Sequence, residues 1–321
     1  MEEQQRHQYG GQAIIEGVMI RGRDRAAVAV RNPAGEICVR ALAVPGWSTG
    51  RLRRIPYIRG MVIFGETLVV GMKALSMSAS LSLEDAEDDD AGPISNTAIV
   101  AMLVVAIGLG IGIFFLAPFF ASKLFENAGL NGFLSNLVEG LLRLGAFVTY
   151  IWLVSRVSDI ERVLAYHGAE HKAVHAQEAG HDMTVESVKK FPTAHPRCGT
   201  AFLLTVMLMA VIVFIFVPRD PLWLVVGSRI LLVPFSAAAA YEFIRYAGRH
   251  GDSLTIRILI SPSILLQEMT TREPKDDQIE VAIEALNHVV KIDQGFPVAD
   301  HNVPASPIWA QSPKGSQEAG D

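Results

Sequence analysis

The sequence NTAIVAMLVVAIGLGIGIFFLAPFFA, residues 96–121, contains no charged side chain. An α-helix rises about 1.5 Å per residue, so this run is long enough to cross a hydrocarbon core of roughly 30 Å. Three further apolar runs have the lengths of membrane-spanning helices; they cover residues 132–155, 201–217 and 222–246. Half of all residues are hydrophobic. We therefore predict a mainly α, polytopic membrane protein built on a four-helix transmembrane bundle.

A few charged side chains lie well inside the predicted spans. Glu139 and Arg143 are four residues apart, so they can pair on one face of the second helix. Arg229 lies inside the fourth span and must face protein or water, because a charge facing lipid is costly. We predict an ion pair between Arg229 and Glu139 across the bundle.

Basic residues are distributed unevenly around the spans. Many precede the first span and many lie in the central loop 156–200, whereas loops 122–131 and 218–221 hold one lysine or arginine each. Loops rich in these residues stay in the cytoplasm, so both termini and the central loop are predicted to be cytoplasmic. We expect a multi-pass protein of the cytoplasmic (inner) membrane, with the lipid bilayer as its partner and an oligomeric state that the sequence does not indicate.

The N-terminal segment 1–57 is predicted to be a small β-containing cytoplasmic domain. Apolar stretches at 27–30 and 37–40 flank Asn32-Pro33-Ala34-Gly35, a pattern typical of a β-hairpin closed by a type I turn. Glycines punctuate the preceding run 10–22, which favours bends or close backbone packing over one long helix. Net charge −5, without interleaved basic and aromatic residues, gives no support for nucleic-acid binding.

Two segments separate this domain from the bundle, which we assign to residues 96–250. Residues 58–82 are apolar but interrupted by Glu66 and Lys73. We interpret them as an interfacial amphipathic helix rather than a fifth span. Residues 83–95 are predicted to be an acidic linker.

The chain after the bundle divides in two. Residues 251–302 form a cytoplasmic C-terminal segment, in which apolar residues recur with helical spacing over 276–291. Residues 303–321 are rich in Pro, Ser, Gly and Gln and are expected to be disordered.

The central loop contains the H-x-x-E-H motif typical of inverzincin metalloproteases, as HGAEH at residues 167–171. On a helix, His167 and His171 lie on one face about 6 Å apart along the axis, so both can bind one metal ion. Glu170 lies beside them and is predicted to be the catalytic base that takes a proton from water. We expect a divalent metal cofactor, with zinc favoured. A helix that simply carries polar residues at the interface is the alternative.

A third metal ligand must come from elsewhere, because His175 lies about 12 Å from His167 along the helix. We predict Glu242, near the cytoplasmic end of the fourth span, where an acidic side chain is costly unless it is used. A salt bridge to a basic neighbour is the alternative for Glu242. His195 and Cys198 precede the third span on the same side of the membrane and are alternative ligands.

Several neighbouring residues have open assignments. His175 and Glu178 extend the histidine face, and they are predicted either to hold a second ion or to orient the metal-binding histidines. Cys198 could instead act as a nucleophile paired with a histidine. Cys38, the other cysteine, lies on the same predicted cytoplasmic side, so we expect no disulfide.

Several motifs together resemble the YqhQ-like family of bacterial membrane proteins. They are GGQAIIEGVMIRG at 10–22, YHGAEHKAVH at 166–175, RCGTAF at 197–202, YE at 241–242 and TTREP at 270–274. The resemblance covers most of residues 9–292 and implies a metal-dependent enzyme of unspecified substrate. Its motif positions correspond here to Glu16, His167, Glu170, His171, His175, Cys198 and Glu242.

Three functions follow from these features. The first is a zinc-dependent hydrolase at the cytoplasmic membrane face, acting on a lipid-linked or membrane-embedded substrate. The second is a non-enzymatic membrane scaffold or assembly factor with a structural metal or a polar network. The third is metal handling or transport. A metal site closed by four protein ligands would favour the scaffold, whereas an open coordination position beside Glu170 would favour the hydrolase. A polar path through the bundle would favour metal transport.

Overall fold

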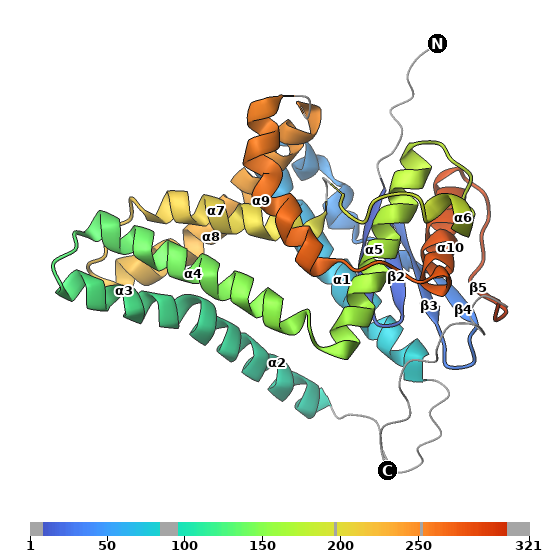
Figure 1. Ribbon diagram of the computed structural model, residues 1–321, viewed down its shortest axis with the longest axis horizontal. Coiled ribbons are helices and arrows are strands. Elements are labelled where there is room, and N and C mark those ends of the chain that lie inside the picture. The colour runs from blue at the N-terminus through green and yellow to red at the C-terminus, as the bar shows by residue number, and fades with distance from the viewer. Residues whose placement is uncertain (1–8, 84–95, 196–197, 251–252, 307–321) are drawn as a thin grey trace.

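The computed structural model describes residues 9–83, 96–195, 198–250 and 253–306. The described chain is mainly helical, with a small antiparallel sheet at one end, from which the long helices of the predicted bundle extend (Figure 1). The predicted acidic linker, apart from Leu83 at the end of α1, and most of the predicted disordered tail lie outside the described residues.

The sheet has five antiparallel strands in the order β1-β2-β3-β4-β5. Its strands are β1 (Gly10–Ile14), β2 (Gly17–Arg21), β3 (Arg25–Arg31), β4 (Ile37–Ala43) and β5 (His301–Val303). The predicted hairpin is confirmed as β3 and β4, with Arg31 opposite Ile37. The amide of Gly35 donates to the carbonyl of Asn32 (2.9 Å), and Gly35 has a φ of 90°, which is left-handed and favours glycine.

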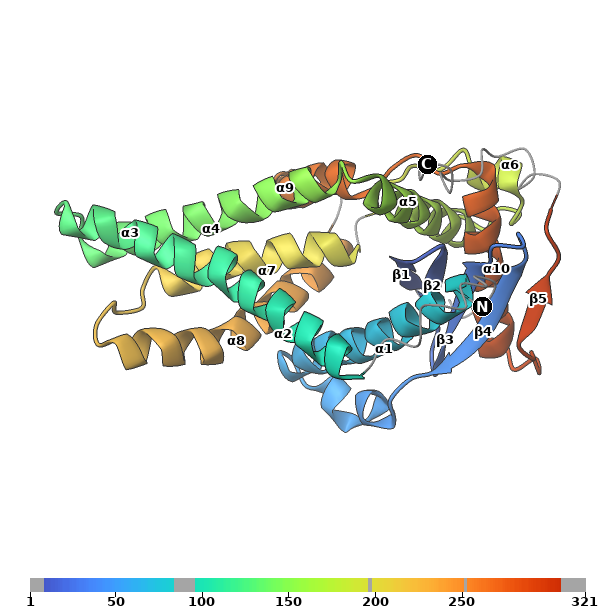
Figure 2. The ribbon, with the colours of Figure 1, turned by 90° about the horizontal axis from the view of Figure 1, so that it is seen from below.

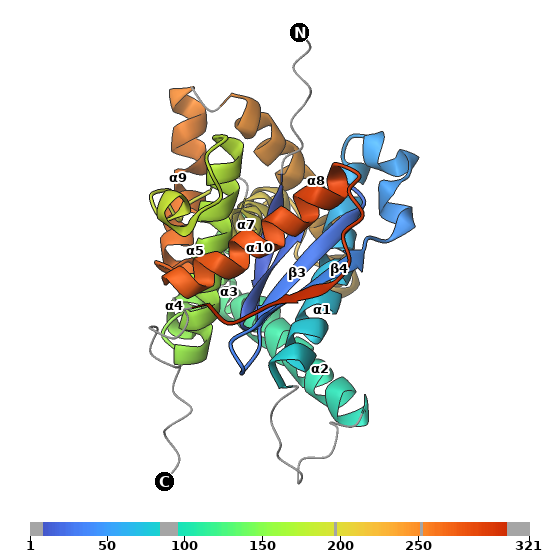
Figure 3. The same cartoon turned by 90° about the vertical axis from the view of Figure 1, so that its right-hand side faces the viewer.

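Strand β5 differs from our expectation for the C-terminal end. We predicted disorder from residue 303, but Val303 pairs with Ile37, and His301 pairs with Val39. The sheet is therefore made from both ends of the chain, and β5 lies along its edge (Figure 3).

Helices cover both faces of the sheet. Helix α1 (Ile58–Leu83) packs on one face through Val70, Ala74 and Leu81. On the other face lie α5 (Ser158–Glu178) and α10 (Asp276–Asp293), which contribute to a second buried cluster (Figure 2). The predicted C-terminal helix at 276–291 is thus confirmed as α10. Because α5 lies between the sheet and the bundle, it joins the two parts of the molecule.

The bundle is formed by helices that turn back far from the sheet (Figure 1). Its elements are α2 (Asn96–Ile111), the π-helical turn Gly112–Leu116, α3 (Ala117–Asn127), α4 (Gly132–Val154), α7 (Gly199–Phe214) and α8 (Leu222–Arg249). Helix α9 (Leu254–Thr270) contacts α7 and α4. Short helices occur at α6 (Val185–Val188), η1 (Gly46–Thr49) and η2 (Arg51–Arg54).

In the described chain, four helices are long and apolar enough to cross a membrane; three of them overlap our first, second and fourth predicted spans, and α1 is present in place of α7. They are Ile58–Ser82, Val104–Asn127, Gly132–Val154 and Trp223–Gly248. Helix α7, our third span, has 16 residues. It is therefore about 24 Å long and shorter than a typical membrane core. Helix α1 has the length and composition of a span, although one of its faces packs on the sheet.

The charged residues inside the bundle form one network. Glu139 accepts from Arg143 (2.7 Å), Arg229 (2.5 Å) and Arg219 (3.0 Å), which confirms both predicted pairs. The π-helical turn contributes as well, because the carbonyl of Phe114 accepts from Arg143 Nε (2.8 Å). The guanidinium groups are thus paired within the protein rather than exposed to lipid.

Candidate functional site

Helix α5 is unusual because its buried face carries several polar side chains. The buried polar residues are His167, Glu170, His171 and Lys172. Burying a polar group is costly unless it is hydrogen-bonded, so each of these side chains requires a partner. Two extended segments beside α5 supply most of the partners.

The first segment begins at the last residue of α9 and contacts the N-terminal half of α5. The Nδ1–H of His167 donates to the carbonyl of Thr270 (2.7 Å), and the amide of Arg272 donates to the carbonyl of Leu164 (3.0 Å). Gly168 makes this approach possible, since a Cβ atom there would lie 2.1 Å from the carbonyl oxygen of Arg272. The glycine of the HGAEH motif is therefore required by packing.

The second segment precedes α7. The Nδ1–H of His171 donates to the carbonyl of Thr193, and the Nε2–H of His175 donates to the carbonyl of Ala194 (2.9 Å). Gln267 fixes this segment by bonding both the amide (2.8 Å) and the carbonyl (2.9 Å) of His195. The histidines of α5 are thus oriented by backbone carbonyls, as metal-binding histidines commonly are.

These hydrogen bonds determine the tautomers of two histidines. A carbonyl oxygen can only accept, so Nδ1 carries the proton in both His167 and His171. The Nε2 atom of each ring then presents a lone pair, which is the state that binds a metal.

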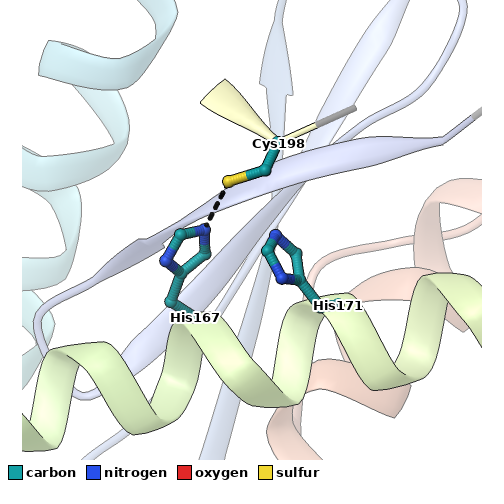
Figure 4. A group of neighbouring side chains, drawn as sticks. All are labelled: His167, His171 and Cys198. Atoms are coloured by element: carbon teal, nitrogen blue, oxygen red, sulfur yellow. Dashed lines mark hydrogen bonds between the residues drawn. The ribbon is translucent and has the colours of Figure 1, made fainter. Parts of the chain in front are cut away.

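Cys198 completes the group from the N-terminus of α7 (Figure 4). Its Sγ lies 3.2 Å from His167 Nε2, and it accepts from the amide of Thr200 (3.4 Å). One ligand atom from each of His167, His171 and Cys198 lies within 4.8 Å of the others, and all three side chains are buried. Ligands of a tetrahedral zinc ion, with bonds of about 2.0–2.3 Å, are separated by distances of this order. We call these residues the His–Cys cluster.

Glu170 is adjacent to the His–Cys cluster without belonging to it. Its Oε2 lies 3.5 Å from His171 Nε2, and its side chain is 4% exposed. The contact with His171 is the polar contact that the described residues give this carboxylate, and it is an ion pair only when the imidazole is protonated. A buried carboxylate is costly unless a positive charge lies next to it. A cation bound by the cluster would supply that charge.

A second group of potential ligands continues along α5. His175, Glu178 and His195 each offer one ligand atom within 4.8 Å of the others. The ring centroid of His195 lies 5.6 Å from the ring centroid of His171 and 4.5 Å from that of His175. Burial lowers the pKa of His175, so its imidazole is neutral near pH 7.

Glu242, our predicted third ligand, is not in either group of described residues, and metal binding by Glu242 stays a prediction. Its carboxylate is bound by Arg59 on α1, with an Nε–Oε1 distance of 2.6 Å, and by the amide of Tyr57 (3.2 Å). The salt-bridge alternative for Glu242 is therefore observed, and the basic partner is Arg59, which is 183 residues earlier in the chain. Cys198, the alternative ligand, is the residue that lies with His167 and His171 in the described part of the chain.

Glu16 also lies apart from the His–Cys cluster. It occupies the turn between β1 and β2 with a φ of 52°, and its carboxylate accepts from both Arg162 and Tyr166. Tyr166 is fully buried, and burial together with the charge of Glu16 raises its pKa. Glu16 therefore holds the start of α5 against the sheet.

Sequence reasoning did not identify the residues that orient the histidines. Thr193 and Thr270 act through backbone carbonyls, which no side-chain pattern indicates. The sequence did contain a signal for Thr270, because this residue is the first of the TTREP motif. Gln267 lies in helix α9, which also contains Arg257 and Glu268, so its polarity alone did not single it out.

Comparison with known proteins places the chain among relatives without an assigned activity. Residues 55–292 match the family described as "Protein of unknown function (DUF1385)". The chain is 32% identical over 297 residues to "Uncharacterized protein YqhQ" of Bacillus subtilis (strain 168), an alignment that covers 89% of this chain and 93% of that protein. No solved structure matches. The comparisons support the resemblance to YqhQ-like proteins and give no support for a metal-dependent enzyme.

Proposed function

The chain belongs to the DUF1385 family of proteins of unknown function, and from its His–Cys cluster we propose that it is a metal-dependent hydrolase, with zinc as the expected ion. One observation carries the proposal. His167 and His171 are held by carbonyls in the tautomer that presents both Nε2 atoms as ligands close to the thiol of Cys198, and a buried carboxylate lies beside them.

The residues have distinct proposed roles. His167, His171 and Cys198 hold the ion and leave a coordination position open, as in catalytic rather than structural zinc sites. When bound there, zinc would polarise a carbonyl or phosphoryl oxygen and lower the pKa of a water molecule. Glu170 takes the proton of the attacking water, since its carboxylate lies next to the ligand set without being part of it.

The position of the cluster supports a substrate that resides in the membrane. Cys198 caps the end of α7 nearest the sheet, and α5 follows α4 after only three residues (Figure 1). The site therefore lies where the apolar helices meet the sheet. Together with the distribution of lysine and arginine, this supports a multi-pass protein of the cytoplasmic membrane with both termini inside. The proposed substrate is lipid-linked or membrane-embedded.

The scaffold and transport hypotheses have weaker support. A structural zinc site is usually closed by four protein ligands, whereas the cluster has three in the described part of the chain. A cation path through the bundle is disfavoured by the three arginines around Glu139, because their positive charges repel a divalent ion.

Metal analysis of the purified full-length protein tests the ligand set. We expect His171→Ala and Cys198→Ser to hold less metal than the wild type, because the ion of the His–Cys cluster is lost, and Glu170→Gln to retain the wild-type metal content. His250→Ala is the matched control, because His250 is exposed at the end of α8 and lies outside both ligand groups. Wild-type metal content in His171→Ala would refute the proposed centre.

A second experiment tests hydrolysis without knowledge of the substrate. Inverted membrane vesicles containing either the wild type or Glu170→Gln are incubated in heavy-oxygen water, and their lipids and membrane peptides are analysed by mass spectrometry. Hydrolysis transfers oxygen from water to the product, so the wild type should generate a labelled species that Glu170→Gln does not. If the two samples carry the same labelled species, the hydrolase proposal fails.

A further inference from the structure

The second group of ligands on α5, formed by His175, Glu178 and His195, is separate from the cluster used for the proposed reaction. Its donors are two imidazoles and one carboxylate, whose ligand atoms all lie within 4.8 Å of one another. Two histidines and one glutamate are the protein ligands of a well-known class of zinc sites. We propose that this group is a second divalent-metal site, and we call it the His–Glu site.

The distance between His195 and Glu178 suits two ligands of one metal ion. His195 Nε2 and Glu178 Oε2 are 3.6 Å apart. A hydrogen bond between nitrogen and oxygen spans about 2.7–3.2 Å, whereas two ligands with metal bonds of about 2.0–2.2 Å are separated by about 3.3–3.6 Å in a tetrahedral site. The observed separation corresponds to the second case.

The His–Glu site is preorganised in the same way as the His–Cys cluster. His175 donates through Nε2 to the carbonyl of Ala194 (2.9 Å), so the lone pair lies on Nδ1. His195 is 5% exposed in its side chain, and both its amide and its carbonyl are bonded by the fully buried Gln267. Glu178 is 30% exposed, which gives water access to the remaining coordination positions.

Two ions on α5 would occupy separate centres. His171 and His175 are one helical turn apart, which places the centres about 6 Å from each other. Metal pairs that share a bridging ligand are only about 3.5–4 Å apart. The segment that carries His195 also carries Thr193, whose carbonyl orients His171. An ion in the His–Glu site would therefore fix the backbone that orients a ligand of the first ion.

The two centres differ in chemistry, which allows them to be measured independently. The His–Cys cluster includes a thiolate and favours soft ions, whereas nitrogen and oxygen ligands suit harder ions. Cobalt(II) is a suitable probe because a thiolate ligand produces an intense charge-transfer band, whereas a site of nitrogen and oxygen ligands produces only weak visible bands. The His–Glu site does not depend on the hydrolase proposal.

The test is a cobalt(II) titration of the full-length protein in detergent. We expect two equivalents in the wild type and one in Glu178→Gln, which should keep the complete charge-transfer band. Cys198→Ser should also bind one equivalent, without that band. His181→Ala is the matched control: its ring contacts Phe191 as that of His175 does, yet it belongs to neither ligand group, so two equivalents should remain.

Glu178→Gln is the decisive variant because it keeps the size of a partly exposed side chain and leaves both histidines of the site unchanged. Uptake of two equivalents by Glu178→Gln would overturn the His–Glu site. So would a wild type that binds one equivalent, if Cys198→Ser removes it and Glu178→Gln does not. If the wild type binds cobalt(II) without showing the charge-transfer band, the His–Cys cluster is refuted instead.

Discussion

Replacing Gly168 by alanine should damage the metal site through the backbone alone. The new Cβ would lie 2.1 Å from the carbonyl oxygen of Arg272, whereas a Cβ atom is essentially never found within 3.0 Å of another heavy atom. The segment 270–272 must therefore move away from α5 by about 0.9 Å. Thr270 belongs to that segment and orients His167. The displacement is close to half of a zinc–nitrogen bond of about 2.0 Å.

Two effects of Gly168→Ala can be given magnitudes. Overpacking of this kind costs about 1–3 kcal/mol of stability. Loss of a residue that orients a metal ligand typically lowers metal affinity about 10–100-fold. Thermal unfolding of the full-length protein in detergent measures the first, and competition with a coloured chelator measures the second.

Gly199→Ala is the matched control for Gly168→Ala. Gly199 is next to Cys198 in the first turn of α7, and nothing lies within 4 Å of the Cβ that alanine would add. Alanine there should be neutral or stabilise by about 0.4–1 kcal/mol, with unchanged metal affinity. If Gly168→Ala retains both the unfolding temperature and the metal affinity of the wild type, the role that we give to the Arg272 contact is refuted.

Three further predictions concern residues outside the His–Cys cluster. Glu139→Gln should cost about 3–5 kcal/mol in thermal unfolding, because it leaves buried arginines without a carboxylate, whereas Glu126→Gln, at a partly exposed ion pair, should cost much less. Glu242→Gln should retain the full metal content, and metal loss in this variant would restore our first choice of ligand. Burial lowers the pKa of His288, so as the pH falls the unfolded chain takes up a proton at this histidine before the folded chain does. The free energy of unfolding should therefore decline as the pH falls below about 6.5. In unfolding temperatures measured from pH 7.5 to 5, His288→Phe should reduce this dependence on pH.

Hydropathy predicted most of the helical architecture, because long apolar runs have few alternatives. The helices at α4 and α8 lie where we placed them, and the run at 96–121 was correctly identified as helical. Helix α1 was ambiguous for a physical reason: it buries Val70 and Ala74 against the sheet while its opposite face, including Leu68 and Met72, stays exposed. Hydropathy sums both faces and cannot separate a span from a helix that lies on a sheet.

Strand β5 and the third ligand were not predictable for a related reason. Three residues are too short for an alternating pattern, and β5 forms only because β4 presents an open edge. Similarly, the H-x-x-E-H spacing specified two ligands on one helix face, but topology placed both Glu242 and Cys198 at the same end of the bundle. The choice between them depended on Arg59, which binds Glu242 from a distant part of the chain.

The ligands and the groups that orient them come from different parts of the fold. His167 and His171 belong to the helix that packs on the sheet, whereas Cys198 begins a helix of the bundle and Thr270 ends another. A bound ion would thus connect the sheet to the bundle. At a free concentration one hundred times its dissociation constant, the ion would add about 2.7 kcal/mol to the free energy of unfolding. An enzyme and a scaffold would share this contribution, because both require the same ligands. Glu170 is the residue that distinguishes them, since its carboxylate is needed for proton transfer but is not part of the ligand set.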